Sequence, residues 1–271
     1  GGKDSTVLMH LCEILKKDIL CVFSNTGCES PSIVKFVHEM QREGHNIMII
    51  RPKLTPKQVW GKYGFPLVSK EAAENIHAIR INPNSVKSQK ALGILNPNSR
   101  FVLAKKWRYL IDETYETSNS CCDILKKNPA HKFAEENGLS AITGMMASES
   151  QLREKTYLRR GGCNVFGKIS SSQPLSIWTD DDIWQYIHEN NVKIADIYKK
   201  GASRTGCMGC GFGCQFEDDR RLEILYRLYP KYYNFVMNFT NNGVTYREAM
   251  RKMLSVNGLF LPDENSQLTL F

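Results

Sequence analysis

The chain has 271 residues, 42% hydrophobic and 24% charged, which is enough for one large globular domain or a domain with a subdomain. No run approaches the roughly 18 uncharged apolar residues of a membrane span, and the start lacks a secretory signal, so we expect a cytoplasmic protein without membrane contact. The net charge of +8 favours an anionic partner, and the nine unevenly spaced cysteines exclude the disulfide scaffold of a small secreted protein.

The first half of the chain alternates helical and strand patterns. Residues 6–17 carry apolar side chains at helical spacing, and the short apolar run at 19–24 is typical of a buried strand. A second helix is predicted over 31–43 with Ser30 as its cap, and the next strand follows at 46–52. This alternation predicts βαβ units, that is, an α/β fold with a parallel twisted sheet and helices on both faces.

The later elements continue this pattern less regularly. Residues 52–100 are rich in Pro, Asn, Lys and Gly, which indicates an insertion of short helices and loops that can cover a site. From this alternation and the change of composition after residue 200, we expect an α/β domain over 1–200 and a small, cysteine-rich helical region over 201–271. The remaining predictions are strands at 140–144 and 173–178, and helices near 99–114, 129–137, 147–158, 180–190, 217–239 and 244–256.

The first six residues, "GGKDST", have the composition of a phosphate-binding loop. Glycines let backbone N–H groups approach an anion, and the following helix N-terminus adds partial positive charge. The full charge of Lys3 and the hydroxyl groups of Ser5 and Thr6 complete the cradle. The spacing is not the Walker pattern, so an ordinary glycine turn before a capped helix is the alternative.

This stretch resembles the pyrophosphate loop of the adenine nucleotide alpha hydrolases, the PP-loop ATP pyrophosphatases, with their first serine lost before Gly1. The resemblance implies a Rossmann-like fold and an N-terminally truncated chain. The segment "VFSNTGCES" at 22–30 is similar to a second nucleotide-binding segment of that superfamily. The nucleotide contacts implied by the resemblance are Gly1, Gly2, Lys3, Asp4, Ser5, Thr6, Asn25, Thr26, Gly27 and Glu29.

Two cysteine pairs point to a metal site. Cys121 and Cys122 are adjacent and poorly placed to bridge each other, while Cys207 and Cys210 have the two-residue separation that lets two thiolates reach one centre. A redox pair or half a zinc site would explain the second pair equally well. Lys126 follows the first pair closely, and positive charge favours deprotonated sulfur.

A double cysteine followed by CxxC after 84 residues resembles the iron–sulfur type of the phosphoadenosine phosphosulfate (PAPS) and adenosine phosphosulfate (APS) reductase family. The resemblance implies a [4Fe-4S] cluster on Cys121, Cys122, Cys207 and Cys210, with a four-thiolate zinc site as the alternative. In "ITGMMASESQLR", Gly144 and Arg153 match the segment that binds the sulfate or phosphate end of the nucleotide. Cys214 has no fixed place in this pattern.

The resemblance implies an enzyme of sulfur metabolism but leaves its reaction open. One reading is an ATP pyrophosphatase that adenylates an acceptor for sulfur transfer, as in DNA phosphorothioation or RNA thiolation, with Lys3 and Arg153 as catalytic residues and Mg²⁺ as a candidate cofactor. Its partners would be ATP, a nucleic acid and a sulfur donor such as cysteine desulfurase. The alternative is an APS or PAPS reductase that works with thioredoxin, although the chain ends without the family's C-terminal nucleophilic cysteine. A non-catalytic nucleotide or nucleic-acid binding module is the third reading.

Overall fold

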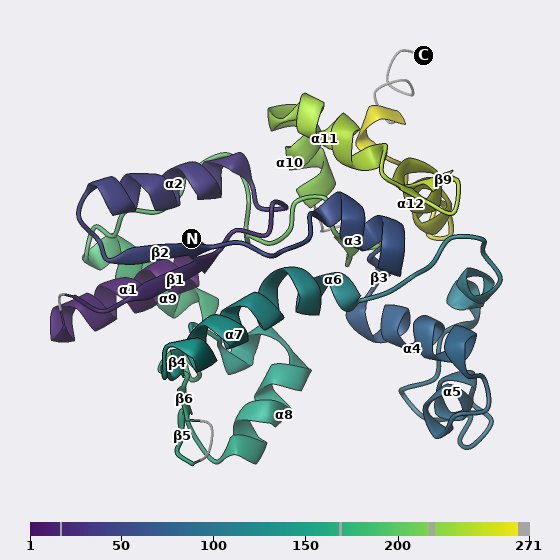
Figure 1. Cartoon of the computed structure of the whole chain (residues 1–271), viewed down its shortest axis with the longest axis horizontal. Helices are drawn as coiled ribbons and strands as arrows, with labels where there is room; N and C mark the ends of the chain where they lie inside the picture. Colours follow the sequence, from purple (N-terminus) through teal and green to yellow (C-terminus); the bar gives the residue numbers. More distant parts are fainter. Residues whose placement is uncertain (17, 168–169, 217–219, 265–271) are drawn as a thin grey trace. The chain divides into compact units, whose positions relative to one another are not determined.

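The chain folds into two units, each assembled from segments that are distant in sequence (Figure 1). The structure is a computed structural model that describes residues 1–16, 18–167, 170–216 and 220–264. Unit 1 comprises residues 1–25, 29–51 and 128–206, and unit 2 comprises residues 26–28, 52–127 and 207–271. Both units are described here only for the residues given above.

Unit 1 is an α/β unit with parallel strand pairs. Strand β1 (Cys21–Ser24) pairs in parallel with β2 (Ile47–Ile50), and β4 (Ala141–Ile142) pairs in parallel with β6 (Ser171–Ser172). Strand β5 (Asn164–Val165) joins β6 in the antiparallel sense. Figure 1 shows α2 alongside the β1–β2 pair, where it contacts β2, while α7 contacts β1. The helices of this unit are α1 (Lys3–Leu15), α2 (Pro31–Arg42), α7 (Asn128–Glu136), η3 (Ala147–Glu149), α8 (Gln151–Arg160) and α9 (Asp180–Glu189).

The apolar core of unit 1 joins the first and last of these helices. Val7 and Leu8 of α1 pack with Ile183 and Ile187 of α9, and all four side chains are buried together with Met146 and Leu175. Ile183 and Ile187 are four residues apart, and the partly buried Leu11 follows Val7 and Leu8 at helical spacing, so each helix presents one apolar face to the other. The packing fixes the start of α9 relative to the start of α1.

Unit 2 is mostly helical and has an aromatic core. Trp60, Phe65 and Tyr246 are completely or almost completely buried and lie within ring-contact distance of one another, at centroid separations of 4.7–6.5 Å. Strands β3 (Leu67–Val68) and β7 (Gly211–Phe212) pair in parallel, and β8 (Thr240–Asn241) forms a hairpin with β9 (Val244–Thr245). The helices are α3 (Pro56–Tyr63), α4 (Lys70–Ile81), α5 (Val86–Leu92), η1 (Lys105–Ile111), α6 (Ser120–Cys122), η2 (Asp123–Lys127), α10 (Arg221–Leu228), α11 (Pro230–Met237) and α12 (Tyr246–Ser255).

The predicted α/β class with parallel strands is confirmed, as are helices near 31–43, 129–137, 180–190 and 244–256 and the short helices within 52–100. The predicted helix over 217–239 is two helices that meet at Pro230, because proline cannot continue a helix from the preceding turn; residues 217–219 lie outside the described ranges. None of the described helices combines the length and the apolar character needed to cross a membrane.

Two predicted elements are wrong. Residues 173–178 form no strand but successive turns, in which Ser176 N donates to Gln173 O and Trp178 N donates to Leu175 O. The apolar Leu175 favoured the strand prediction. Its side chain is indeed buried, but the backbone around it forms a turn. The predicted helix over 99–114 is reduced to the 3₁₀ helix η1, since Ser99 accepts a hydrogen bond from Phe101 N and thereby competes with helix formation.

Candidate functional site

The predicted phosphate loop, residues 1–6, forms the N-cap and first turn of α1, which begins at Lys3 rather than at residue 6 as predicted. Gly2 is the N-cap residue, and its carbonyl oxygen accepts from Thr6 N at 3.0 Å, from Thr6 Oγ1 at 3.0 Å and from Ser5 Oγ at 2.9 Å. The first N–H groups of a helix have no partner within the helix, and the helix dipole adds partial positive charge at this end. A helix N-terminus of this kind can bind an anion.

Lys3 is held in this turn by two carboxylates. Its side chain is only 4% exposed, and its Nζ donates to Asp4 Oδ1 at 2.8 Å and to Asp180 of α9. Burial lowers the pKa of Lys3, but the hydrogen bonds to Asp180 and Asp4 outweigh it, so the pKa is raised overall. The ammonium group therefore carries its full charge at neutral pH.

The backbone of the loop is supported from two further directions within unit 1. Lys3 N donates to the hydroxyl group of Tyr198 at 2.7 Å, and that hydroxyl lies 3.3 Å from Thr205 Oγ1. Gly144, shortly after β4, approaches the loop so closely that a Cβ atom there would lie 3.1 Å from Asp4 O. A side chain at this position would therefore push the loop backbone away by a few tenths of an ångström.

Arg153 also lies near the loop. Ser150 caps α8 by accepting from Arg153 N at 3.3 Å, and the Arg153 guanidinium forms an ion pair with Glu149 one turn earlier. Partial burial lowers the pKa of Arg153, while the Asp4 carboxylate acts in the opposite direction, which places the two charges within electrostatic range. The structure thus brings Lys3, Asp4, Gly144 and Arg153 together in unit 1.

The second predicted nucleotide segment divides between the units. Asn25 N donates to Ile50 O and extends the β1–β2 ladder, and Asn25 and Glu29 belong to unit 1. Thr26 and Gly27 belong to unit 2, where Thr26 Oγ1 accepts from Cys28 N at 3.2 Å and Gly27 O accepts from the Tyr232 hydroxyl at 2.8 Å. Gly27 has a φ of 81°, a left-handed conformation that favours glycine.

The four predicted cysteine ligands all lie in unit 2 and gather at one place. Cys122, Cys207 and Cys210 pack in one cluster with Ala73 and Phe212. The thiol of Cys121 is hydrogen-bonded to Cys122 and interacts electrostatically with Cys207 and Cys210. Thiols separated by 84 residues of sequence are therefore neighbours in space.

The neighbouring thiols of this cysteine cluster shift one another's pKa values. The hydrogen bond from Cys121 lowers the pKa of Cys122 to about 6, with Lys70 and Lys127 acting in the same direction. The same hydrogen bond, burial and the other thiols raise the pKa of Cys121, and burial and Cys207 raise that of Cys210. Each of these thiols, when it loses its proton, therefore makes deprotonation of its neighbours less favourable.

The backbone around Cys207 and Cys210 is tightly held. Cys210 N donates to Cys207 O at 3.1 Å, and the buried Tyr246 hydroxyl donates to Gly209 O at 2.9 Å. A Cβ atom on Gly211 would lie only 2.6 Å from Pro66 O, so strand β7 must begin with glycine to pair with β3. The cysteine loop is therefore anchored in the core of unit 2.

The other cysteines are placed differently. Cys214 is buried and its Sγ donates to Cys210 O at 3.2 Å, with the Arg221 guanidinium 3.9 Å from the sulfur. Burial raises the pKa of Cys12 and raises that of Cys21 to about 11, so both are poor nucleophiles. Among the residues that the structure describes, no group of three or more His, Cys, Asp or Glu side chains has the arrangement that would hold a single metal ion.

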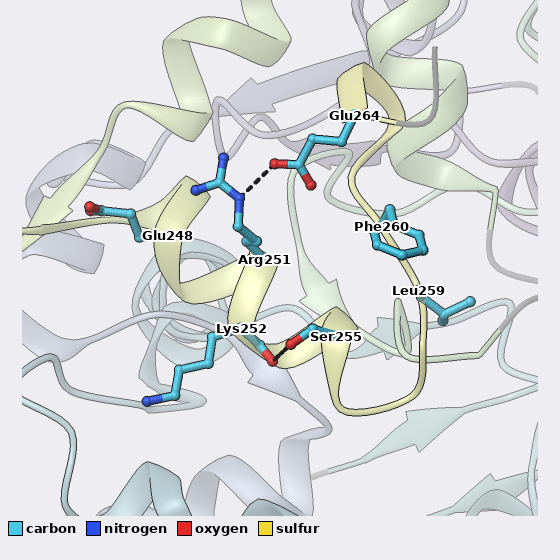
Figure 2. A pocket seen from close by; sticks show the side chains of 7 residues that line it. All are labelled: Glu248, Arg251, Lys252, Ser255, Leu259, Phe260 and Glu264. Atoms are coloured by element: carbon cyan, nitrogen blue, oxygen red, sulfur yellow. Dashed lines mark hydrogen bonds and ion pairs between the residues drawn. The ribbon is translucent and has the colours of Figure 1, made fainter. Parts of the chain in front are cut away.

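A pocket of about 510 Å³ lies elsewhere in unit 2, between α12 and the segment that follows it (Figure 2). Arg251 Nε donates to Glu264 Oε1 at 2.6 Å, and Lys252 forms an ion pair with Glu113. Both of these cationic side chains in the pocket lining therefore already have a carboxylate partner. None of the described residues that line the pocket is a predicted site residue. The lining consists of Glu248, Arg251, Lys252, Ser255, Leu259, Phe260 and Glu264.

Comparison with known proteins identifies the family. The family profile described as "Phosphoadenosine phosphosulfate reductase domain" matches residues 1–86 and 86–211. The chain belongs to the phosphoadenosine phosphosulfate reductase domain family. The match covers both the phosphate loop and the four cysteines of the cluster, so both features lie within the PAPS reductase domain.

Curated relatives of this PAPS reductase domain match over part of their length. An uncharacterized protein of Methanocaldococcus jannaschii is 29% identical over 250 residues, which is 88% of this chain and 46% of that protein. Adenosine 5'-phosphosulfate reductase of Neisseria meningitidis serogroup B is 30% identical over 105 residues, 39% of this chain and 42% of that enzyme. The chain thus spans about half the length of these relatives.

A solved structure is also similar to this chain. The crystal structure of phosphoadenylyl-sulfate (PAPS) reductase from Candida auris, a phosphate complex, matches with a TM-score of 0.38 and 16% identity over 74% of each chain.

Sequence reasoning missed two residues that contact the loop. The sequence places Asp180 only at the start of the helix predicted near 180–190, and no pattern in it singles out Tyr198. The run of three aspartates at 180–182 is a local signal for Asp180, although nothing in it distinguishes a cap from a partner of Lys3. Neither contact follows from spacing, since 177 and 195 residues separate Asp180 and Tyr198 from Lys3.

Proposed function

We propose that this PAPS reductase-family protein is an enzyme of sulfur metabolism that binds an adenine nucleotide at the Gly1–Thr6 loop and acts at its α-phosphate. The observation that carries the proposal is the position of Lys3 in the first turn of α1, next to Asp4 and with Arg153 in electrostatic range. A helix N-terminus and two cations at one place are what departing pyrophosphate requires for stabilisation.

In the reaction that we favour, an oxygen of the acceptor attacks the α-phosphorus of ATP and the bond to the β-phosphate breaks. The pyrophosphate leaves with the bonding electrons, and the first-turn N–H groups, Lys3 and Arg153 stabilise its charge. A sulfur nucleophile from a donor then displaces AMP from the adenylated acceptor. Mg²⁺ bound with the nucleotide would neutralise further phosphate charge. The positive net charge of the chain, +8, suits a nucleic acid as the acceptor.

We further propose that Cys121, Cys122, Cys207 and Cys210 hold a [4Fe-4S] cluster. Support comes from the packing of these thiols in unit 2 and from the mutual electrostatic penalty that a cationic centre would relieve. In a four-iron cluster each thiolate binds a different iron, so the sulfurs need not converge on one point as they do around Zn²⁺. When bound, the cluster would cross-link two distant segments and supply a redox or sulfur-carrying centre.

A sulfonucleotide reductase is the second candidate, favoured by the relatives whose printed name is adenosine 5'-phosphosulfate reductase. In that reaction a thiolate attacks the sulfate sulfur, the sulfur–oxygen bond to the nucleotide breaks, and a second thiol from thioredoxin then releases sulfite. This chemistry needs a thiolate that reaches the substrate. The raised pKa values of Cys12 and Cys21 make these two thiols poor choices.

Product analysis separates the two reactions. The chain is incubated with ATP, a nucleic-acid acceptor and a sulfide donor, and in separate reactions with APS or PAPS and reduced thioredoxin, and the products are identified by chromatography. We expect pyrophosphate and AMP from ATP, and we expect Lys3→Ala to abolish their release. Lys16→Ala is the matched control, because this exposed lysine lies at the opposite end of α1. Sulfite released from APS or PAPS would establish the second candidate, and an unchanged rate for Lys3→Ala would remove the loop from the mechanism.

The metal site is tested by anaerobic purification. We expect a brown protein with about four irons per chain that loses its colour in Cys121→Ser and Cys210→Ser. Cys12→Ser is the control and should stay brown, because Cys12 lies in unit 1. A colourless protein with one zinc ion would contradict the cluster assignment.

A further inference from the structure

The ammonium group of Lys3 is covered by a carboxylate that is itself exposed. The Lys3 side chain is 4% exposed, whereas that of its partner Asp180 is 59% exposed. An incoming phosphate oxygen cannot reach a buried ammonium group unless a covering group moves. The exposed carboxylate of Asp180 is the group that can move at the lowest cost, because water replaces its lost hydrogen bond.

The backbone of Asp180 is held in place, so a movement away from Lys3 would involve the side chain alone. Thr179 caps α9 in a reciprocal capping box with Asp182, so the first turn of the helix is fixed on both sides of Asp180. Within the length of the shared apolar core, His10 of α1 and Tyr186 of α9 are joined by a hydrogen bond of 2.8 Å. The core and this hydrogen bond hold α9 against α1, so Asp180 stays within reach of Lys3.

The local charge balance disfavours a phosphate as long as Asp180 is in place. Lys3 is paired with two carboxylates, Asp4 and Asp180, and Arg153 is paired with Glu149. A phosphate group that approached the Lys3 ammonium group would be repelled by both carboxylates on it. Removing Asp180 from Lys3 takes away one of these negative charges and frees one N–H donor of the ammonium group.

We propose that Asp180 is a displaceable counterion: it holds the Lys3 ammonium group in the empty site, and the phosphate group of the nucleotide takes its place on binding. The inference rests on the proposed role of the loop in nucleotide binding. Asp180 then stabilises the empty protein, since a buried ammonium group with fewer partners is costly. The same contact weakens nucleotide binding, since the phosphate has to compete with it.

The two consequences have opposite signs, and Asp180→Asn tests both. The substitution keeps the shape of the side chain and removes its charge. Asp181→Asn is the matched control, because it removes the same charge from the next position of the same helix turn. Thermal unfolding of the full chain is measured without ligand, and binding of inorganic pyrophosphate and of AMP is measured by calorimetry at low and physiological salt.

We expect Asp180→Asn to unfold at a lower temperature than the wild type without ligand, yet to bind pyrophosphate about fivefold more tightly at low salt. Asp181→Asn should change pyrophosphate affinity by less than about twofold, since exposed charges off the contact are screened. A lower unfolding temperature with weaker or unchanged pyrophosphate binding would overturn the inference, because it would make Asp180 a structural residue alone. Equal gains in pyrophosphate affinity for Asp180→Asn and Asp181→Asn would also overturn the inference, because the gain would then come from a long-range charge effect.

Failure of this inference is distinguishable from failure of the proposed function. Wild-type protein and Lys3→Ala are titrated with pyrophosphate in the same series. If neither binds, or if both bind equally, the loop itself is not the phosphate site and the proposed function fails. If the wild type binds pyrophosphate and Lys3→Ala does not, the loop is the phosphate site. The result for Asp180→Asn then decides the role of Asp180.

Discussion

Replacing Gly144 by alanine would place a methyl group against the backbone of the phosphate loop. Its Cβ atom would lie 3.1 Å from Asp4 O, 3.2 Å from Asp4 C and 3.4 Å from Ser5 N. These neighbours are backbone atoms in the first turn of a helix, so the loop or the segment after β4 must shift by a few tenths of an ångström. Overpacking of this kind costs about 1–3 kcal/mol.

The loss should appear in both stability and nucleotide binding. A cost of about 1 kcal/mol lowers the unfolding temperature of a chain of this size by roughly 2–4 °C. A shift of the loop donors away from the phosphate should weaken ATP and pyrophosphate binding by about tenfold, which corresponds to about 1.4 kcal/mol. Calorimetric unfolding and titration with each ligand measure the two effects separately.

Gly61→Ala is the control for a glycine-to-alanine change as such. Gly61 lies inside α3, and a Cβ atom there would make only an ordinary contact of 3.5 Å with Thr240 O, so alanine should be tolerated or mildly stabilising. If Gly144→Ala binds pyrophosphate as the wild type does and unfolds at the same temperature, the close approach of this segment to the loop is refuted.

Two further predictions concern the contacts that hold this unit. Tyr198→Phe removes the hydroxyl group that accepts from Lys3 N at 2.7 Å, and the unpaired buried donor should cost about 1–3 kcal/mol in urea unfolding. Tyr226→Phe is the control and should cost little, because it keeps the half-buried ring that packs 5.2 Å from the ring of Tyr233. Tyr198→Phe with wild-type stability would mean that water or another group serves this donor. Hydrogen bonds from the Thr179 backbone and hydroxyl lower the pKa of Asp182 from 3.8. The capping contribution of Asp182 is therefore complete above pH 3.8 and is lost as the pH falls through its lowered pKa. Stability measured from pH 5 to pH 2 should consequently fall less steeply in Asp182→Asn than in Asp181→Asn, and identical slopes would contradict this assignment.

Local patterns in the sequence predict much of the fold. Ser30 before Pro31 and Thr179 before three aspartates mark the starts of α2 and α9, because a capping side chain satisfies N–H groups within its own turn. The apolar run at 19–24 contains β1 for a similar reason, as burial of a short strand requires contiguous apolar side chains. The run at 173–178 misled the prediction, since an apolar residue such as Leu175 is buried equally well by a turn.

The sequence by itself determined the two local features from which we propose the chemistry of this protein: a glycine-rich helix start with Lys3, and two close pairs of cysteines. Both are local patterns, in which neighbouring residues specify the kind of group that can bind. Only the tertiary structure decided that Asp180 and Tyr198 contact Lys3 and that Cys122 packs with Cys207 and Cys210. These contacts join residues tens to hundreds of positions apart, and they form because apolar faces and close glycine contacts bring whole segments together, which no local pattern encodes.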